Sequence, residues 1–469
     1  MQWQLPQSEH PAYLRVINLI ESSINNGTLL PGTRLPAERR LAALLGVNRS
    51  TIQRALAELV ARGMLLRKVG AGTWVNPGKW GVQAPVAWHD YLNTNRLSGP
   101  EPYAVRLAAL QHESDAIDLA NSTVAADLAL PISSAGLSLA ALVQQEAAMD
   151  MTGLLELKQA LIRQRGLAVN PQQVLITSGA QQAYYLIAQG LLSQGDAIAI
   201  EAPSYFYQLT LFQAAGIRVY GVPRIGGALD LEALSMVYHQ HHVRFLFVDP
   251  TGQNPTGTTM SLAERQALLA RCRSLQLPIV EDDLLGLVPG PKTLPALYQL
   301  DPQNVLLIGS LSSLIGPHAR IGWLIALPGV VSRLAQIRQQ MEAEISVFPQ
   351  QLATQFLKQA DFNDAVAHQQ AQLAIRRQAL ESALLPFVAE GTLSFAQPQA
   401  NNHLWVHLNV PRQLKAGDYQ AFLQARVLVR PDWLFGTREN CVRMSFARFD
   451  PLLGHLLTAR LATIFASWR

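Results

Sequence analysis

Cysteine and long apolar runs are scarce in this sequence of 469 residues. Its two cysteines, Cys272 and Cys441, are too few for a disulfide framework or a structural zinc site, so we expect buried thiols, a reducing compartment and no bound metal. No stretch approaches the ~20 uninterrupted apolar residues that a membrane span needs. Residues 1–13 also lack the basic start and the apolar run of a signal peptide, which predicts a cytoplasmic protein.

Charged residues are few as well, at 15% of the chain, whereas hydrophobic residues reach 49% and the mean hydropathy is +0.12. This composition supplies enough apolar material for large cores and excludes a disordered chain. The length is about three times that of a typical domain, so we expect two or three compact units.

Basic residues are concentrated at the N-terminal end. Residues 1–75 contain nine Lys or Arg and four Glu, so they carry +5, while the rest of the chain carries −1 of the total of +4. This distribution is typical of a chain in which one module meets phosphates and another does not. A solvated basic face on a small domain is the alternative explanation.

The spacing of apolar residues predicts three helices at the N-terminal end. The first covers residues 11–25, the second covers residues 37–45, and the third starts after a tight turn with Asn48 or Ser50 as its cap. The segment MLLRKVGAGTWV then alternates apolar and basic residues around a Gly-Ala-Gly turn, as in a two-stranded hairpin. Together these elements predict a helix-turn-helix followed by a wing.

In such a motif the N-terminal end of the second helix enters the DNA major groove. Arg49 is suited to reading guanine and Gln53 to reading adenine, whereas flanking cations such as Arg67 are suited to phosphate contacts. The residues that we expect to contact DNA are Arg34, Arg39, Asn48, Arg49, Ser50, Thr51, Gln53, Lys68 and Gly70.

Three motifs, PGTRLPAERRLA, GVNRSTIQRA and GAGTWV, follow one another in this region. In order and spacing they resemble the winged helix-turn-helix domain of GntR-type bacterial regulators. The resemblance implies binding to a double-stranded DNA operator.

Residues 76–112 are rich in Pro, Gly and polar residues and lack a sustained period, which predicts a linker. We therefore divide the chain into a DNA-binding domain (1–75), a linker (76–112) and a large domain (113–469).

In the large domain, short apolar runs alternate with helix-length segments: VLITSG, DAIAIEAP, RVYGVP, VRFLFVDP, LPIVEDD and NVLLIGS. This alternation is typical of an α/β fold with a mostly parallel sheet that is buried on both faces. Polar residues and glycines follow the strands directly, where ligands bind in such folds, so we expect a pocket there.

The order of these signals resembles the fold-type I aminotransferases that use pyridoxal 5'-phosphate, over roughly 350 residues. The motifs are TSGAQQA, EAPSY, QNPTG, VEDD, GSLSSLIGPHARIG and CVRMSFA. The resemblance implies that the cofactor is bound by Gly179, Ala180, Gln181, Tyr205, Asn254, Asp282, Ser310, Ser312 and Arg320. Within this set it implies that Tyr205 stacks on the pyridine ring, that Asn254 hydrogen-bonds the ring oxygen and that Asp282 pairs with the ring nitrogen. It also implies that Arg443 binds the carboxylate of a substrate or effector.

A GntR-type domain joined to an aminotransferase-like domain is the architecture of the MocR subfamily of regulators, which covers the whole chain. This resemblance implies a head-to-tail homodimer whose large domain senses a small anionic effector, such as an amino acid or a compound related to vitamin B6.

The sequence departs from the family where covalent chemistry requires an amine. The family has S-x-S-K before its arginine, but the lysine position here is Ser313. A hydroxyl cannot form a Schiff base with the cofactor, nor does it move a proton as a lysine amine does. Of the six lysines, Lys292 is the least improbable substitute. We therefore expect a cofactor or adduct that is bound noncovalently, if it is bound at all, and no catalytic residue.

Two further positions differ: Leu284 and Ala148 replace tyrosines that contact the cofactor in the family. Three changes in one site favour natural loss of function over a single engineered replacement. We therefore interpret the chain as a DNA-binding transcriptional regulator with a noncatalytic sensor domain. The alternatives are an aminotransferase acting on amino acids with an accessory DNA-binding domain, and a DNA-binding scaffold whose large domain binds nothing.

Overall fold

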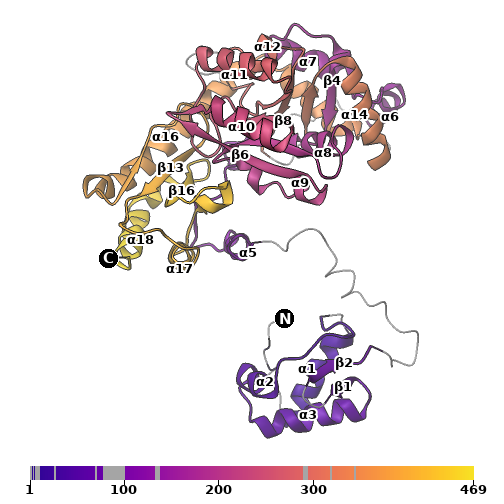
Figure 1. Cartoon of the computed structure of the whole chain (residues 1–469), viewed down its shortest axis with the longest axis vertical. Coiled ribbons are helices and arrows are strands. Elements are labelled where there is room, and N and C mark those ends of the chain that lie inside the picture. The colour runs from indigo at the N-terminus through magenta and orange to yellow at the C-terminus, as the bar shows by residue number, and fades with distance from the viewer. Residues whose placement is uncertain are drawn as a thin grey trace. The chain divides into compact units, whose positions relative to one another are not determined.

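The chain folds into two compact units, Met1–Ser98 and Gly99–Arg469 (Figure 1). The computed structural model describes residues 11–25, 28–68, 71–77, 101–132, 138–288, 294–316, 320–342 and 345–468, together with Trp3 and Leu5. In this part of the chain no helix is both long and apolar enough to cross a membrane, and no three His, Cys, Asp or Glu residues gather as metal ligands. Cys272 and Cys441 are free and buried, as predicted.

The N-terminal unit contains the predicted winged helix-turn-helix. Its elements are α1 (Ala12–Asn25), α2 (Glu38–Leu45), α3 (Arg49–Ala61), β1 (Leu65–Lys68) and β2 (Gly72–Val75). Helix α2 stops at Gly46 in a left-handed conformation, and Asn48 stands at the N-cap of α3 without a side-chain capping bond. The strands β1 and β2 form an antiparallel pair, with Leu65 opposite Val75.

Apolar residues on one face of each helix form the core of this unit. The fully buried members include Val16, Ile17 and Ile20 of α1, Leu41 of α2, and Ile52, Ala55, Leu56 and Leu59 of α3. Because the inward face of α3 is apolar at i, i+3, i+4 and i+7, its polar residues point to the solvent.

The C-terminal unit is built on an eight-stranded sheet in the order β4-β11-β10-β9-β8-β5-β6-β7. These strands are β4 (Val174–Thr177), β5 (Ala197–Ala202), β6 (Arg218–Ile225), β7 (Ala228–Leu229), β8 (Val243–Val248), β9 (Ile279–Asp282), β10 (Val305–Ser310) and β11 (Gly322–Ile325). From β10 to β6 the neighbours are parallel, whereas β11 is antiparallel to both β10 and β4. The prediction of a mostly parallel sheet is confirmed, including all six predicted strands.

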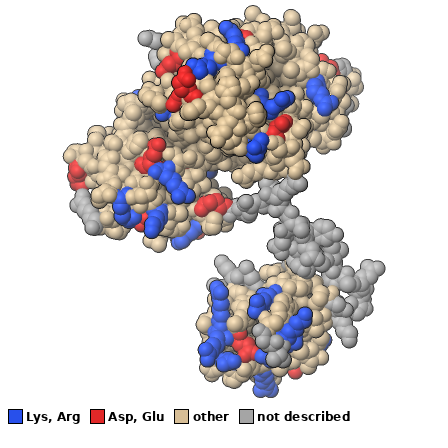
Figure 2. Space-filling model, in the orientation of Figure 1, with Lys and Arg blue, Asp and Glu red and all other residues tan. Residues whose placement is uncertain are grey.

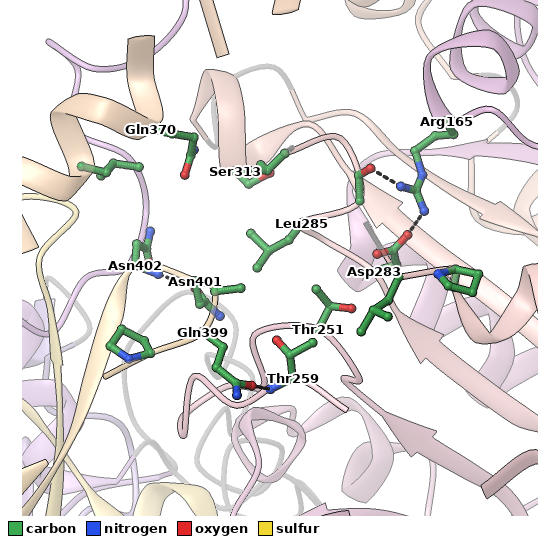
Figure 3. A pocket seen from close by; sticks show the side chains of 18 of the residues that line it. Arg165, Thr251, Thr259, Asp283, Leu285, Ser313, Gln370, Gln399, Asn401 and Asn402 are labelled. Carbon is green, nitrogen blue, oxygen red and sulfur yellow. Dashed lines mark hydrogen bonds and ion pairs between the residues drawn. The ribbon is translucent and has the colours of Figure 1, made fainter. Parts of the chain in front are cut away.

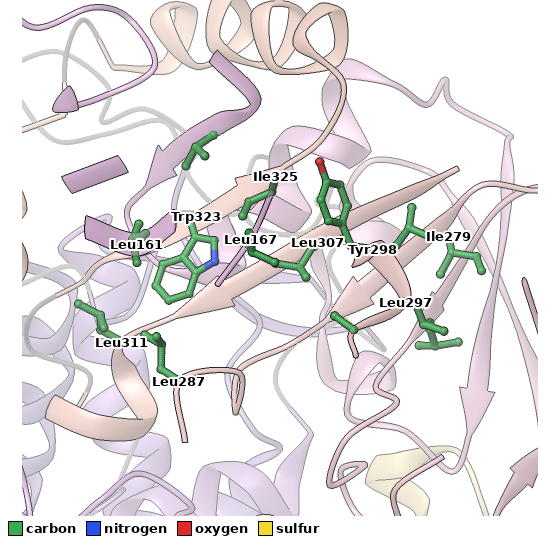
Figure 4. Close-up of a cluster of buried hydrophobic side chains, with 14 of the residues drawn as sticks. Leu161, Leu167, Ile279, Leu287, Leu297, Tyr298, Leu307, Leu311, Trp323 and Ile325 are labelled. Carbon is green, nitrogen blue, oxygen red and sulfur yellow. The ribbon is translucent and has the colours of Figure 1, made fainter. Parts of the chain in front are cut away.

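Helices cover both faces of this sheet. One face packs against α8 (Ala180–Gly190), α9 (Leu211–Ala214) and α14 (Pro328–Met341). The other packs against α7 (Leu155–Arg165), α10 (Leu231–His241), α11 (Leu262–Ser274), α12 (Leu297–Leu300) and α15 (Val347–Leu357). Figure 4 shows Leu307, Trp323 and Ile325 of adjacent strands within this second cluster. The residue next to Leu307 on each side, such as Ile308, belongs to the opposite cluster, as the pleat of a strand requires.

A second, antiparallel sheet lies in the C-terminal part of the unit, in the order β12-β13-β16-β15. Its strands are β12 (Leu393–Phe395), β13 (His403–Leu408), β15 (Arg430–Pro431) and β16 (Cys441–Ser445). It shares a core with α16 (Phe362–Ala389), α17 (Gln420–Gln424), α18 (Gly454–Ala466) and the short parallel pair of β3 (Ile117–Asp118) and β14 (Val427–Leu428).

The end of the predicted linker has a regular structure. Residues Pro102–Leu110 form α5, with Glu101 as its N-cap, and Tyr103 and Leu107 are buried in the core of the second unit. The short helix carries only two inward residues, too few to give the sustained period on which the sequence analysis relied. The stretch that we assigned to the linker therefore includes one helix of the C-terminal unit.

Candidate functional site

The first turn of α3 presents polar side chains to the solvent. Asn48, Arg49, Ser50 and Gln53 are exposed and Thr51 is half-buried, whereas the apolar residues of α3 face the core. Arg34, Arg39 and Lys68 are exposed as well, and Gly70 lies outside the described residues. Figure 2 shows several Lys and Arg side chains on the visible face of this unit. The structure thus brings the described members of the predicted DNA set to the surface of the unit.

A carboxylate that the sequence analysis overlooked links three of the basic and polar side chains. Oε2 of Glu38 accepts bonds from Arg49 at 3.4 Å and from Gln53 at 3.0 Å, while its other oxygen pairs with Arg67 of β1. Glu38 therefore holds both predicted base-reading side chains next to the wing. In the sequence, Glu38 stands in the motif PGTRLPAERRLA, which does not show which side chains the carboxylate contacts.

In the C-terminal unit, a cavity of about 310 Å³ lies at the carboxyl ends of the parallel strands. All nine predicted cofactor residues line it, although they are spread over more than 140 positions of the sequence: Gly179, Ala180, Gln181, Tyr205, Asn254, Asp282, Ser310, Ser312 and Arg320. Ser313 and Leu284 line the same cavity, whereas the side chain of Ala148 lies outside the described residues.

One end of this cavity has the features of a phosphate site. Gly179, with φ of +95°, turns the chain so that α8 begins with free backbone N–H groups at the cavity. A Cβ atom on Gly322 would come within 2.6 Å of the Gly179 carbonyl carbon, so only glycine permits this approach. The hydroxyls of Ser310 and Ser312 lie 3.0 Å apart, and exposed Arg320 completes this end of the wall. Hydroxyl donors, amides and a guanidinium suit a phosphate group.

Asp282, which also lines this cavity, fits a protonated pyridine nitrogen. Its side chain is 5% exposed, and Oδ1 has no hydrogen-bond partner among the described residues. Burial is the main cause that raises the pKa of Asp282 to about 7; the Tyr184 hydroxyl opposes this shift, and the buried carboxyls of Asp283 and Glu201 add to it. A cationic partner would stabilise the ionised carboxylate. The residues present therefore fit the phosphate and the ring of pyridoxal phosphate.

The two predicted ring contacts are tied to each other. The Tyr205 N–H donates to the Asn254 carbonyl at 3.0 Å, and the Tyr205 hydroxyl accepts from Gln181 at 3.2 Å. Arg443 is 2% exposed and does not line the cavity; its Nη1 donates to Asn254 Oδ1 at 2.9 Å. The predicted carboxylate-binding arginine thus lies directly behind Asn254.

Ser313 stands in α13 (Ser312–Ile315), where the family has its lysine. Its Oγ donates to the Leu284 carbonyl at 2.8 Å. No lysine is among the described residues that line this cavity, Lys158 is bound to Asp150 and Thr152, and Lys292 lies outside the described residues. The described residues do not fit a covalent link to the cofactor.

A second cavity of about 560 Å³ adjoins the first and was not foreseen from the sequence. Leu285, Ser313, Asn401 and Asn402 line both cavities, together with Thr251. Figure 3 shows these side chains facing one another, with Arg165 paired to Asp283 at the rim. Because residues 399–402 and α16 form one side of this space, only the packing of distant segments reveals it.

Residues 133–457 match the family model described as aminotransferase class I and II, which covers more than half of the chain. The chain belongs to the class I and II aminotransferase family. Residues 12–75 match the model for bacterial regulatory proteins of the gntR family. This combination confirms the MocR-type architecture that the sequence indicated.

Relatives with both parts are known by name. A Bacillus subtilis protein named uncharacterized HTH-type transcriptional regulator YdfD is 29% identical over 449 residues, which cover 93% of this chain and 92% of that protein. The HTH-type transcriptional regulator NorG of Staphylococcus aureus is 24% identical over 435 residues, which cover 88% of this chain and 95% of NorG.

Solved structures resemble the aminotransferase part. LysN, the α-aminoadipate aminotransferase of Thermus thermophilus, matches with a TM-score of 0.67 and 26% identity over 78% of this chain and 97% of LysN, and its structure is a complex with N-(5'-phosphopyridoxyl)-L-leucine. A kynurenine aminotransferase of Pyrococcus horikoshii matches with a TM-score of 0.67 and 22% identity, over 79% of this chain and 95% of that protein, and supports the fold.

Proposed function

We propose that this class I and II aminotransferase family member is a DNA-binding transcriptional regulator whose large domain is a noncatalytic sensor. Ser313 at the wall of the cavity is the observation that carries the proposal. The site keeps features suited to binding a phosphorylated ring, while the position from which an amine would react holds a hydroxyl bound to the Leu284 carbonyl. The relatives' names as transcriptional regulators support the same function.

The ligand that we propose for the cavity is pyridoxal 5'-phosphate or an adduct of it, bound noncovalently. The α8 amides, Ser310, Ser312 and Arg320 would hold the phosphate, and Asp282 would hold the ring nitrogen. Tyr205 would cover the ring and Asn254 would bind its oxygen. When bound in an enzyme, this cofactor acts as an electron sink, but the described cavity offers no amine to move a substrate proton.

The N-terminal unit supplies the output of this sensor. Arg49 and Gln53 would read base edges from α3, and the exposed cations around them would contact phosphates. We expect a head-to-tail homodimer in the cytoplasm that binds paired half-sites in DNA.

Calorimetric titration with pyridoxal phosphate, together with absorbance spectra, tests the sensor. We expect saturable binding without the absorbance of a covalently linked cofactor in the native protein, and with that absorbance in Ser313→Lys. Absence of binding to both proteins would favour a scaffold, and turnover of an amino acid by the native protein would favour the enzyme. Footprinting on the gene's own promoter region tests DNA binding separately.

A further inference from the structure

A second arginine lies beside Arg443. The strands β15 and β16 place Arg430 directly opposite Arg443, so both side chains leave the same face of the sheet. Both guanidiniums donate to one carbonyl, that of Ala120: Nε of Arg430 at 3.1 Å and Nη2 of Arg443 at 2.7 Å. Buried Arg443 and half-buried Arg430 thus converge on a single neutral acceptor.

The other partners of these guanidiniums are neutral too. Arg430 Nη1 donates to the side-chain oxygen of Gln208 at 2.8 Å and Arg443 Nη1 to that of Asn254 at 2.9 Å, while the buried Nε of Arg443 has no partner. Within the described residues no carboxylate lies within ion-pair distance of either arginine; Asp118 acts on both from farther away. Burial and the charge of Arg430 lower the pKa of Arg443 to about 9, so Arg443 remains a cation at neutral pH. Burial also lowers the pKa of Arg430.

Buried arginines elsewhere in this unit are compensated differently. Arg224 is paired with Glu201, and Arg165 with Asp283. Arg338 is held by two backbone carbonyls, and among the described residues no second arginine shares these acceptors. Two like charges that share one acceptor, one of them buried and the other half-buried, are unfavourable without a counter-charge.

The pair lies against the wall of the first cavity. Asn254, which Arg443 contacts, lines the cavity, as does Ser122, two residues after the shared carbonyl. Tyr205 also lines it, and its phenol acts electrostatically on both guanidiniums. An anion that displaces the Ala120 carbonyl from inside the cavity would therefore meet both arginines.

We propose that Arg430 and Arg443 together bind a dicarboxylate effector, each guanidinium taking one carboxylate. The inference rests on the proposed function of the cavity as a sensor site and specifies the charge of its ligand. Two negative charges match two cations, and each planar carboxylate fits the two parallel donors of a guanidinium. A monocarboxylate would leave one cation uncompensated.

Glutarate and valerate test this proposal because both have five carbons and differ in one carboxylate. Calorimetry is carried out on the full chain with and without saturating pyridoxal phosphate. We expect glutarate to bind at least about tenfold more tightly than valerate, as the loss of a charge-assisted pair predicts. In Arg430→Gln we expect this preference to vanish while valerate affinity is unchanged, and in Arg430→Lys we expect part of it to remain.

Equal affinities of the wild-type protein for the two acids, or binding of neither, would overturn the dicarboxylate proposal. A parallel loss of both affinities in folded Arg430→Gln would overturn it too. If the variants do not fold, as judged by their thermal midpoints, the wild-type ratio of the two affinities decides alone. Failure of pyridoxal phosphate to bind would count against the proposed cofactor only. It would leave the dicarboxylate proposal open to test, because the two acids are also compared without pyridoxal phosphate.

Discussion

The two candidate sites of this chain are constructed in opposite ways. The DNA-facing residues belong to one short stretch, Arg34–Lys68, and most of them are exposed on local elements. The wall of the cavity comes from segments between Ser122 and Asn402, and the carboxyl of Asp282 in it is buried. A change in the first site should therefore act on binding at the surface, whereas a change in the second should also be felt in the stability of the fold.

The largest effect that we expect comes from Asp282→Asn. A carboxyl whose folded pKa lies near 7, above the ordinary 3.8, favours folding at low pH, and this contribution is lost as the pH rises from about 4 to about 7. An amide does not ionise, so the variant should gain up to about 4 kcal/mol relative to wild type above pH 7, at 1.36 kcal/mol per pKa unit, and little at pH 4. Denaturant unfolding of the C-terminal unit across this range measures the difference.

The same substitution should weaken the binding of pyridoxal phosphate, since an amide offers no negative charge to the protonated ring nitrogen. A variant that is destabilised equally at pH 4 and pH 8 would show that Asp282 does not titrate between these values. DNA affinity serves as the control, because Asp282 belongs to the other unit.

Gly322→Ala should disrupt the phosphate end of the cavity. The new Cβ would meet Gly179 at 2.6–2.8 Å, and overpacking of this kind costs about 1–3 kcal/mol. The matched control is Gly329→Ala in α14, where nothing lies within 4 Å of an added Cβ. We expect lower pyridoxal phosphate affinity and a lower thermal midpoint in the first variant only; equal behaviour of the two variants would contradict the close approach.

Arg49→Ala should reduce operator affinity without changing the cavity. Loss of a bidentate contact to guanine costs about 1–3 kcal/mol and relaxes the preference at one base pair. Fluorescence anisotropy with operator and mutated operators measures both effects. Arg218→Ala, which removes an exposed arginine of the other unit, is the control, and an equal loss in the two variants would argue against base reading by Arg49.

Glu38→Gln should have the smallest effect. Exposed ion pairs such as that of Arg49 and Glu38 contribute little to stability, about 1 kcal/mol or less, so we expect an unchanged thermal midpoint. Removal of a negative charge from the DNA face should tighten binding to nonspecific DNA and reduce operator preference by a few fold. Glu58→Gln, which removes one of the two ion pairs of Arg62 at the end of α3, is the matched control. An equal shift in both variants would mean that only net charge matters.

The sequence predicted the parts that depend on local order. Periodicity located α1, α2 and α3 to within one or two residues. The resemblance to aminotransferases identified Asp282 and Ser310, the last residues of two buried strands, and both line the cavity. The family's spacing also located Ser313. These features depend on the alternation of residues along a strand or on the period of a helix, and a short stretch of sequence is enough to show either pattern.

The missed features depend on contacts across long separations. Arg430 became a candidate only when the register of β15 and β16 placed it opposite Arg443. Glu38 contacts Arg49, Gln53 and Arg67 only because α2 packs beside α3 and β1. The second cavity forms only because the segments of Asn401 and Thr251 come together. No local pattern in the sequence encodes such pairings, because each requires the fold first.

The hydroxyl of Ser313, bound to the Leu284 carbonyl, also has a kinetic consequence. A ligand anchored through a bond to the protein stays until that bond is broken chemically, whereas one held by hydrogen bonds and ion pairs departs with a residence time set by those contacts alone. With serine at this position, occupancy of the cavity can follow a falling ligand concentration as fast as the ligand dissociates. For a regulator, that speed determines how soon the response to a signal ends.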